Sequence, residues 1–462
     1  MKKLIYVLFF LIPFIGHAQQ PWNKSSPLDY MWMNVGNAGF SSRGILYPNL
    51  NFRPSDFLPY VAFADVVNGR ATVMKFDGTN WINVGNAGFS PGGLAYYLSL
   101  AISPSDGQPY VAYGDGGDSL KATVMKFDGA NWINVGNPGF SAGETWYTSI
   151  AFSPTGQPYV AYQDYGNSQK ATVMTFDGTN WVNVGNAGFS AGEADHINLA
   201  FNASGQPYVA YQDYGNDYGA TVMMFDGTNW VNVGNVNFTA GGVSPPSLAF
   251  SPTDGEPYVG FDQNHGVTVM KFDGTSWVYV GNPDFSVWSD YFYVSLAFNS
   301  SGQPFVVYED LQWLKPIVMK FDGINWVYVG PADGFSEGGS YYSSIAISPT
   351  DDQPYVVYAD GGDSLKATIM KYDSISAGVN NIKESILFTY PNPTSKSLIL
   401  DVTILPANLK YIEIEDLKGI RMFEIQTGES KIVLDVENYP AGIYIVKVKT
   451  EGSMWVGKFC KD

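Results

Sequence analysis

The stretch Trp181-Val182-Asn183-Val184-Gly185-Asn186 decides the fold, because the chain repeats it almost unchanged. One earlier copy reads Trp132-Ile133-Asn134-Val135-Gly136-Asn137. A period of about 49 residues indicates an architecture built from one repeated supersecondary unit, and it is too long for ankyrin or leucine-rich solenoids. The tryptophan that opens each copy recurs every 47 to 51 residues, at Trp32, Trp81, Trp132, Trp181, Trp230, Trp277 and Trp326.

Each unit is expected to contain four short strands. In the unit that begins at Thr148, apolar and β-branched runs separated by turn residues predict strands at 149–153, 158–162, 171–176 and 181–184. The Asp177-Gly178 pair between the last two runs is typical of a hairpin turn. Runs such as Tyr159-Val160-Ala161-Tyr162 lack polar alternation, which indicates strands covered on both faces. Four strands per unit at this period are typical of a β-propeller blade.

The two ends of the repeat are complementary. Trp32 precedes the first complete blade, whereas the last blade ends at Asp373 without a tryptophan strand. We therefore predict that residues 30–36 supply the missing outer strand and close a ring, which removes exposed sheet edges. The segment 29–373 resembles the β-propeller superfamily in general and no single enzyme family. Seven blades are expected, because seven second strands begin at Pro59, Pro109, Pro158, Pro207, Pro257, Pro304 and Pro354.

Composition agrees with an all-β protein. The 462 residues include 50 Gly, 27 Pro and 31 Tyr but only 15% charged residues, which suits many short strands and tight turns. The net charge of −18 argues against a nucleic-acid partner, because phosphate contacts need clustered Lys and Arg. Cys460 is the only cysteine, so no intramolecular disulfide is possible. A monomer is expected.

The N-terminus has the pattern of an export signal. Lys2 and Lys3 precede an apolar run at 4–15, and Gly16-His17-Ala18 is a small-residue cleavage site. Residues 1–18 are therefore interpreted as a signal peptide. No later stretch has the length and hydropathy of a transmembrane segment.

After a predicted linker at 374–387 the composition changes, and residues 388–462 are expected to form a small Ig-like β-sandwich. This segment closely resembles the type A C-terminal sorting domain of the type IX secretion system of Bacteroidota. The resemblance implies Sec export, passage across the outer membrane by the type IX machinery, and surface attachment or release. An accessory β-sandwich is the alternative. The matching residues include Tyr390, Pro391, Asn392, Pro393, Gly442, Tyr444, Lys447 and Lys458.

Two recurrent features are expected on one face of the ring. An aspartate follows the second strand in each blade, at Asp65, Asp115, Asp164, Asp213, Asp262, Asp310 and Asp360, and aromatic pairs such as Trp146-Tyr147 precede the inner strand. Aromatic faces beside carboxylates suit sugars. The alternative is that the aspartates cap turns and the aromatics fill gaps between blades. The candidate ligand-binding residues are Asp115, Asp164, Asp213, Asp360, Tyr97, Trp146, Tyr147, Trp288 and Trp313.

Departures from the repeat are the candidates for chemistry. Glu193, Asp195 and His196 replace the aromatics of one blade and are weak candidates for acid–base cleavage of a glycan. Asp115 and Asp118 flank a glycine turn but do not complete an EF-hand loop, so no cofactor is expected and calcium is the alternative. We expect a surface or secreted protein that binds a glycan or another extracellular macromolecule. The alternatives are a polysaccharide hydrolase or lyase and a structural adhesion module.

Overall fold

The computed structural model describes residues 30–239, 241–263, 266–286, 293–310, 314–374, 388–390, 392–402, 410–416, 420–450 and 453–462. Regular structure in these ranges is almost entirely β-strand, with two three-residue 3-10 turns, η1 (Tyr165–Asn167) and η2 (Gly361–Asp363). No helix in these ranges is long and apolar enough to cross a bilayer. The predicted signal peptide lies outside the described residues, as does the predicted linker from residue 375 on.

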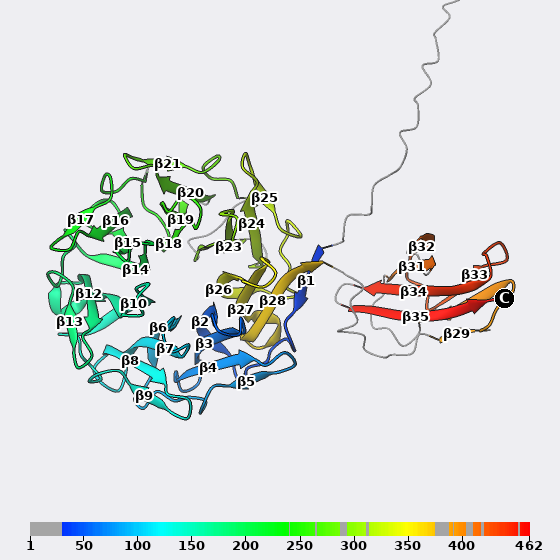
Figure 1. The fold of residues 1–462 in the computed structure, drawn as a ribbon, viewed down its shortest axis with the longest axis horizontal. Helices are drawn as coiled ribbons and strands as arrows, with labels where there is room; N and C mark the ends of the chain where they lie inside the picture. Colours follow the sequence, from blue (N-terminus) through cyan, green and yellow to red (C-terminus); the bar gives the residue numbers. More distant parts are fainter. Residues whose placement is uncertain are drawn as a thin grey trace, which may run out of the picture.

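Seven four-stranded antiparallel sheets in the described ranges form a ring, and each is one blade (Figure 1). Blades 1 to 3 consist of β2 (Ile45–Phe52), β3 (Pro59–Asp65), β4 (Ala71–Phe76) and β5 (Trp81–Asn83); β6 (Ala95–Ile102), β7 (Pro109–Asp115), β8 (Lys121–Phe127) and β9 (Trp132–Asn134); and β10 (Thr145–Phe152), β11 (Pro158–Asp164), β12 (Lys170–Phe176) and β13 (Trp181–Asn183). Blades 4 to 6 consist of β14 (Ala194–Phe201), β15 (Pro207–Asp213), β16 (Gly219–Phe225) and β17 (Trp230–Asn232); β18 (Ser247–Phe250), β19 (Pro257–Gln263), β20 (Gly266–Phe272) and β21 (Trp277–Tyr279); and β22 (Ser295–Phe298), β23 (Pro304–Glu309), β24 (Pro316–Phe321) and β25 (Trp326–Tyr328).

Blade 7 joins the two ends of the repeat. It contains β26 (Ser340–Ile347), β27 (Pro354–Asp360), β28 (Lys366–Ser374) and, in the outermost position, the N-terminal strand β1 (Tyr30–Asn34). β1 runs antiparallel to β28, with Trp32 opposite Tyr372. The predicted seven-bladed ring closed by the N-terminal strand is therefore confirmed.

The repeated tryptophan links each blade to the preceding one. Every indole Nε1 donates a hydrogen bond to the carbonyl oxygen of the valine in the previous copy of the motif. Because Trp32 donates to Val329, the set of bonds runs around the whole ring. The seven bonds measure 2.7 to 2.8 Å and join Trp81 to Val35, Trp132 to Val84, Trp181 to Val135, Trp230 to Val184, Trp277 to Val233, Trp326 to Val280 and Trp32 to Val329.

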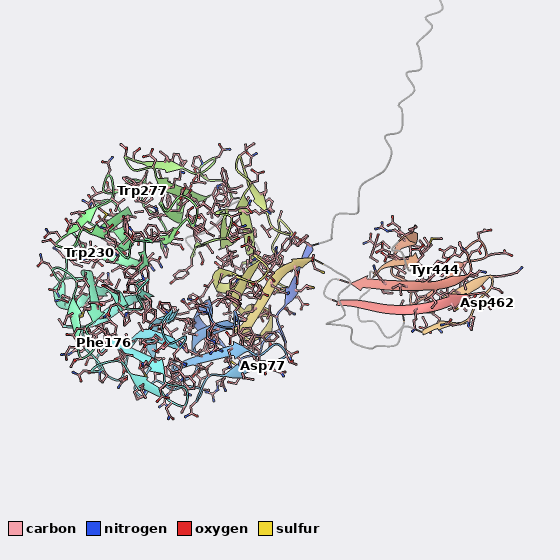
Figure 2. All side chains as sticks on the ribbon, viewed as in Figure 1. Asp77, Phe176, Trp230, Trp277, Tyr444 and Asp462 are labelled. Carbon is pink, nitrogen blue, oxygen red and sulfur yellow. The ribbon has the colours of Figure 1, made fainter. Side chains whose placement is uncertain are left out.

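The glycine that follows this valine in the motif allows the next blade to approach closely. Gly36 has a φ of +74°, and a Cβ there would lie 2.9 Å from the Phe76 ring. Glycine adopts this left-handed conformation without strain, and its missing Cβ leaves room for the next blade. The following phenylalanine then stacks on the tryptophan of that blade, as Phe40 does on Trp81 with ring centroids 4.4 Å apart. The labels for Trp230 and Trp277 in Figure 2 mark two of these linking residues.

The hydrophobic core of the propeller lies between adjacent blades. Val160 on β11 is fully buried, and it belongs to a cluster that combines Tyr110 and Val124 of blade 2 with Ile150 and Trp181 of blade 3. Both faces of each sheet are therefore covered, which accounts for the missing polar alternation. The hairpin turns are polar: Asp177 Oδ1 accepts hydrogen bonds from the backbone N–H groups of Thr179 and Asn180 at 2.8 and 2.7 Å.

The C-terminal unit has two antiparallel sheets around one core. β29 (Phe388–Tyr390), β30 (Ser397–Asp401) and β33 (Lys431–Asp435) form the first sheet. The second contains β32 (Arg421–Thr427), β31 (Lys410–Asp416), β34 (Gly442–Thr450) and β35 (Ser453–Lys461), in that order. Leu398, Ile412 and Val446 are fully buried between the sheets. This arrangement is the small β-sandwich predicted from the sequence.

Candidate functional site

A local irregularity at the start of the inner strands positions the first group of candidate residues. In β10 the pairing with β11 shifts between Trp146 and Ser149, and Tyr147 has a left-handed backbone with a φ of +52°. Such a bulge redirects the side chain at the extra residue. The same conformation recurs at Tyr47, Tyr97, His196 and Tyr342, with φ between +49° and +59°.

These side chains, together with Tyr293, meet around the axis of the ring. We call Tyr47, Tyr97, Tyr147, His196, Tyr293 and Tyr342 the aromatic collar. Six of the seven blades contribute one member, and blade 5 places Pro245 at the corresponding position. The contacts form a closed circuit, with centroid distances of 5.3 Å for Tyr47–Tyr97, 4.4 Å for Tyr97–Tyr147, 4.0 Å for Tyr147–His196, 5.9 Å for His196–Tyr293, 5.8 Å for Tyr293–Tyr342 and 5.4 Å for Tyr342–Tyr47.

Burial favours the uncharged form of several collar residues. Burial raises the pKa of Tyr47 to about 12, with neighbouring collar tyrosines adding to the shift. The pKa values of Tyr97 and Tyr293 are also raised, first by burial. Burial lowers the pKa of His196 to about 4, so this imidazole is neutral at physiological pH. The collar therefore presents apolar ring surface without a fixed charge.

Beside the collar, blades 3 and 4 carry an aromatic and acidic cluster. We call Glu144, Trp146, Tyr165, Glu193, Asp195 and Tyr214 the blade 3–4 patch. The Trp146 ring lies 5.5 Å from both the Tyr97 and the Tyr165 rings, measured between centroids. Trp146 Nε1 donates a hydrogen bond of 2.6 Å to Glu144 Oε1, which fixes the indole against the carboxylate. Tyr165 is 37% exposed and Tyr214 39% exposed.

Asp195 is the buried carboxylate of the patch. It is 7% exposed and accepts hydrogen bonds from the Gln163 side-chain amide and from Tyr214. Burial raises its pKa, an effect that these two bonds partly oppose. The pKa of Glu193 is raised as well, first by burial and then by the charge of Asp195. The charge of Asp195 thus acts on the ionisation of Glu193.

The candidate aspartates at the ends of the second strands are engaged within their own loops. Asp213 is 1% exposed; its Oδ1 accepts from Gly215 N at 3.1 Å and its Oδ2 from Thr221 Oγ1 at 2.9 Å. Asp164 and Asp360 likewise accept from Thr172 and Thr368. Asp115 is 4% exposed and accepts from Gly117 N. This geometry favours turn capping, so the four aspartates are not included in the patch.

One aspartate does not match its counterparts. Asp262 lies five residues after Pro257, whereas Asp164 lies six after Pro158, so Asp262 stands at the position of Gln163. Trp288, Trp313 and Pro391 lie outside the described residues. For calcium, no group of three or more metal-ligating side chains occurs in the described part of the chain, including the surroundings of Asp115 and Asp118.

The weak catalytic candidates separate into two places. Glu193 and Asp195 lie together in the blade 3–4 patch, whereas His196 points into the collar and packs on Tyr147. Among the described residues, no hydrogen bond joins His196 to either carboxylate. Sequence reasoning named Tyr97, Tyr147 and His196 but missed Tyr47 and the collar as a whole. The available signal was a Tyr or His two positions before the Ser or Asn that opens the regular part of the inner strand, in six of the seven blades.

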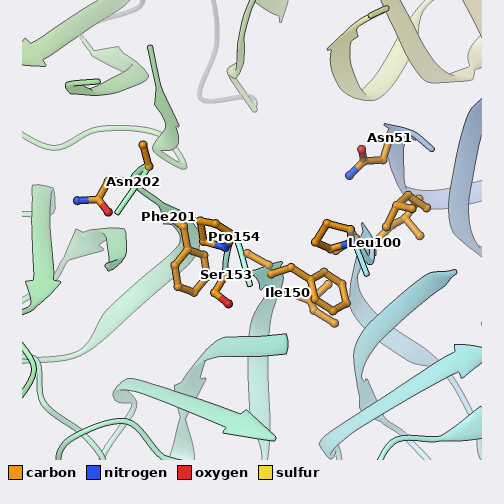
Figure 3. A pocket seen from close by; sticks show the side chains of 13 residues that line it. Asn51, Leu100, Ile150, Ser153, Pro154, Phe201 and Asn202 are labelled. Atoms are coloured by element: carbon orange, nitrogen blue, oxygen red, sulfur yellow. The ribbon is translucent and has the colours of Figure 1, made fainter. Parts of the chain in front are cut away.

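A cavity lies at the opposite end of the same inner strands (Figure 3). Its volume is about 470 Å³. Leu100, Ile150 and Phe201 give it an apolar wall, and Asn51 and Asn202 add amide groups. It is lined by residues 150–154 of blade 3, whereas the collar residue of that blade is Tyr147. The ring therefore offers two separate surfaces along its axis.

The residues of the predicted sorting motif hold the C-terminal unit together. Asn392 Oδ1 accepts a 2.8 Å hydrogen bond from Cys460 N, which ties the start of the unit to its last strand. Tyr444 is 3% exposed and donates to Pro440 O at 2.7 Å. Lys447 Nζ lies 2.6 Å from Glu415 Oε2. Gly442, at the start of β34, has a φ of +158°.

Comparison with known proteins identifies the tail. Residues 389–462 match the family of the secretion system C-terminal sorting domain. No curated protein shows significant sequence similarity to this chain.

Solved structures with a similar arrangement come from distant proteins. PorZ, a surface component of the type-IX secretion system of Porphyromonas gingivalis, has 14% identity over 93% of this chain, with a TM-score of 0.47. This chain covers 61% of the length of PorZ. The Aleuria aurantia lectin has 16% identity over 62% of this chain and 96% of its own, with a TM-score of 0.43. Trypanosoma rangeli sialidase has 9% identity over 92% and 89%, with a TM-score of 0.45.

The domain match and the strand topology together describe an exported protein. The described blades form a ring closed by the N-terminal strand, and a separate β-sandwich follows. The sorting-domain match indicates export through the type IX secretion system to the cell surface or the surrounding medium. The chain is a seven-bladed β-propeller followed by a tail that matches the secretion system C-terminal sorting domain.

Proposed function

We propose that this protein binds a glycan outside the cell and does not cleave it, and that the blade 3–4 patch is the contact surface. Sugars stack their C–H faces on exposed rings while their hydroxyl groups donate to carboxylate oxygens. The Trp146 and Tyr165 rings supply the stacking surface. Glu144 and Glu193 supply partly exposed acceptors beside it.

The observation that carries the proposal is that the patch departs from the repeat. A side chain that served only to fill the blade would recur at the same position in every copy. At the position of Trp146, blade 1 has Leu46, blade 2 has Tyr96 and blade 4 has Asp195. Glu144 corresponds to Leu94 of blade 2. The fold therefore tolerates other residues here, which supports a role in recognition.

The test is glycan binding by the purified protein and by two matched variants. A glycan array selects the ligand, and calorimetric titration measures its affinity. Trp146→Ala should weaken binding about tenfold or more, because it removes the stacking surface. Tyr341→Ala is the control, since Tyr341 occupies the same position in blade 7 and is 37% exposed. An equal loss in both variants, or no glycan bound by the parent protein, would overturn the proposal.

Glycan cleavage is the second candidate, and the raised pKa values of Glu193 and Asp195 favour it. A carboxyl group with a raised pKa suits a general acid. Reducing-sugar release from the bound glycan distinguishes the two functions. Release by the parent protein that disappears in Asp195→Asn would establish the enzyme and contradict the binding-only proposal. Binding without release supports the binding protein.

A further inference from the structure

The charged groups of the blade 3–4 patch have one sign. The charges that raise the pKa of Tyr165, after burial, come from Glu144, Asp195 and Glu193. Within the described part of the chain, none of these three carboxylates forms an ion pair with Lys or Arg. Negative charge at this place is therefore not neutralised by the protein itself.

An unpartnered acceptor adds a second and independent observation. The Gln163 side chain is 1% exposed, and its amide nitrogen donates to Asp195. Its carbonyl oxygen, Oε1, is buried and has no hydrogen-bond partner. A buried acceptor left without a donor is costly, so such an atom marks a place where a donor is expected. Behind the patch, the chain thus provides too few donors for the acceptors around Asp195.

The rings of the patch suit the same kind of partner. A cation is attracted to the face of Trp or Tyr, most strongly to Trp. Trp146 lies between Tyr97 and Tyr165, and its indole is fixed by Glu144. An ammonium group contributes one positive charge and three donors, and it has no acceptor that would oppose the carboxylates. A hydroxyl group offers one donor and no charge.

We propose that the patch selects glycans that carry free amino groups, such as polymers of glucosamine, over neutral or acidic glycans. The inference rests on the proposed glycan-binding function and names its ligand class. One amino sugar uses both parts of the patch: its C–H face stacks on Trp146 and Tyr165, and its ammonium group lies against Glu144 and Glu193. A lysine-rich peptide would match the charges without needing two adjacent rings, so the aromatic pair favours the sugar.

The test compares two oligosaccharides that share one backbone. Glucosamine hexamer and its N-acetylated counterpart are titrated into the purified protein at about pH 5.5, where the amines of the glucosamine chain are protonated. The amino form should bind at least about tenfold more tightly, and its affinity should fall as salt is raised because the attraction is between charges. The affinity of the acetylated form should change little with salt.

Two isosteric variants locate the effect. The double variant Glu144→Gln, Glu193→Gln should bring the affinity for the amino form down to that of the acetylated form, which itself should stay unchanged. Glu337→Gln is the control, because Glu337 is exposed in the corresponding loop of blade 7. An unchanged preference in the double variant would overturn the assignment of the carboxylates.

The remaining outcomes separate this inference from the proposed function. Equal or tighter binding of the acetylated hexamer would overturn the amino-sugar inference and leave glycan binding standing. Absence of binding to these hexamers and to every glycan on the array would overturn both. Binding of a lysine hexapeptide as tightly as the glucosamine hexamer would show that the patch recognises positive charge in general and would overturn the sugar assignment.

Discussion

Glu309 shows how one buried residue sets a pH dependence for the whole fold. It stands at the position that Gln163 and Gln212 hold in other blades, it is 2% exposed, and its Oε2 has no hydrogen-bond partner. Ser343 N donates to Oε1 at 2.9 Å. Burial raises the pKa of Glu309 to about 7, well above the value of about 4.3 for an exposed glutamate. The carboxyl is therefore protonated in the folded protein over a range in which it ionises when unfolded.

The sign of this linkage gives the first prediction. Because the folded-state pKa is raised, the stabilising contribution is present below about pH 4 and is lost as the pH rises through about 7, on the order of 3 kcal/mol in all. Glu309→Gln should remove this loss, so that the variant unfolds at a higher temperature than the parent at about pH 8. Thermal unfolding of both proteins at about pH 5 and pH 8 provides the measurement. A parent protein equally stable at both values, with no gain in the variant, would contradict the prediction.

Asp213 distinguishes turn capping from ligand binding. Its carboxylate accepts from Gly215 N, Asn216 Nδ2 and Thr221 Oγ1, so Asp213→Ala leaves the buried Thr221 hydroxyl and two loop donors without this acceptor. We expect a loss of about 2 to 4 kcal/mol in the free energy of unfolding, measured in denaturant. Glycan affinity of the folded variant should be unchanged. If Asp213→Ala weakened glycan binding without a loss of stability, Asp213 would be a ligand-binding residue and not a turn cap.

For single residues, the sequence identified which side chains lie near the site more reliably than the direction in which each side chain points. The sequence placed Tyr97, Trp146 and Tyr147 next to an inner strand, and the structure places them in the collar or the patch. It could not show that His196 points to the axis while Asp195 turns toward Gln163. That difference arises from the left-handed backbone at the bulge, and no short motif encodes it. Asp262 was wrongly grouped with the other aspartates: its strand keeps the register of the repeat, with Asp262 opposite Val267 as Gln163 is opposite Ala171, so Gln263 holds the position of Asp164.

Among the elements, the pairing of β1 with β28 closes the ring. Trp32 is 6% exposed, donates its indole N–H to Val329 and stacks on Phe335 with centroids 3.9 Å apart. Trp32→Ala should lower the free energy of unfolding by about 3 to 5 kcal/mol, because a large buried ring is removed and the Val329 carbonyl loses its indole donor. Denaturant unfolding measures it. Ile324→Ala is the control, since Ile324 is 78% exposed, and its effect should stay within about 0.5 kcal/mol.

Removal of the whole strand is the stronger form of that test. Deletion of residues 30–36 leaves β28 without its outer partner and exposes a sheet edge. The variant should lose its cooperative thermal transition and aggregate. An unchanged melting temperature would mean that closure contributes nothing to stability.

The sequence predicts that each strand exists but does not predict all of the strand boundaries. In blade 3 the first strand is observed at Thr145–Phe152, four residues earlier at its start than the predicted 149–153. Strands were predicted from the alternation of side chains between the two faces of a sheet, and this alternation is interrupted where the pairing shifts between Trp146 and Ser149. The prediction therefore omitted the strand residues before the bulge. The third strand, Lys170–Phe176, begins one residue before the predicted 171–176 and ends with it, because its apolar run is uninterrupted.

For the molecule as a whole, the tail determines where the propeller is found. Residues 389–462 match the sorting-domain family, so a chain that ends at residue 388 should accumulate in the periplasm of a host with a type IX system. Cell fractionation and immunoblotting locate the protein. The full chain is the control and should reach the surface or the medium. Equal export of both chains would show that the tail is not required.

Closure through β1 also decides how the propeller bears tension. The chain leaves the ring from β28, which is held by β27 on one side and by β1 on the other. A pull applied through the C-terminus thus acts on a strand clamped between two partners, and the indole bond of Trp32 ties that sheet to blade 6. If the tail is attached to a surface and the propeller binds a polymer, a force between the two acts on neighbouring blades together. A single strand is then not pulled out of its sheet alone.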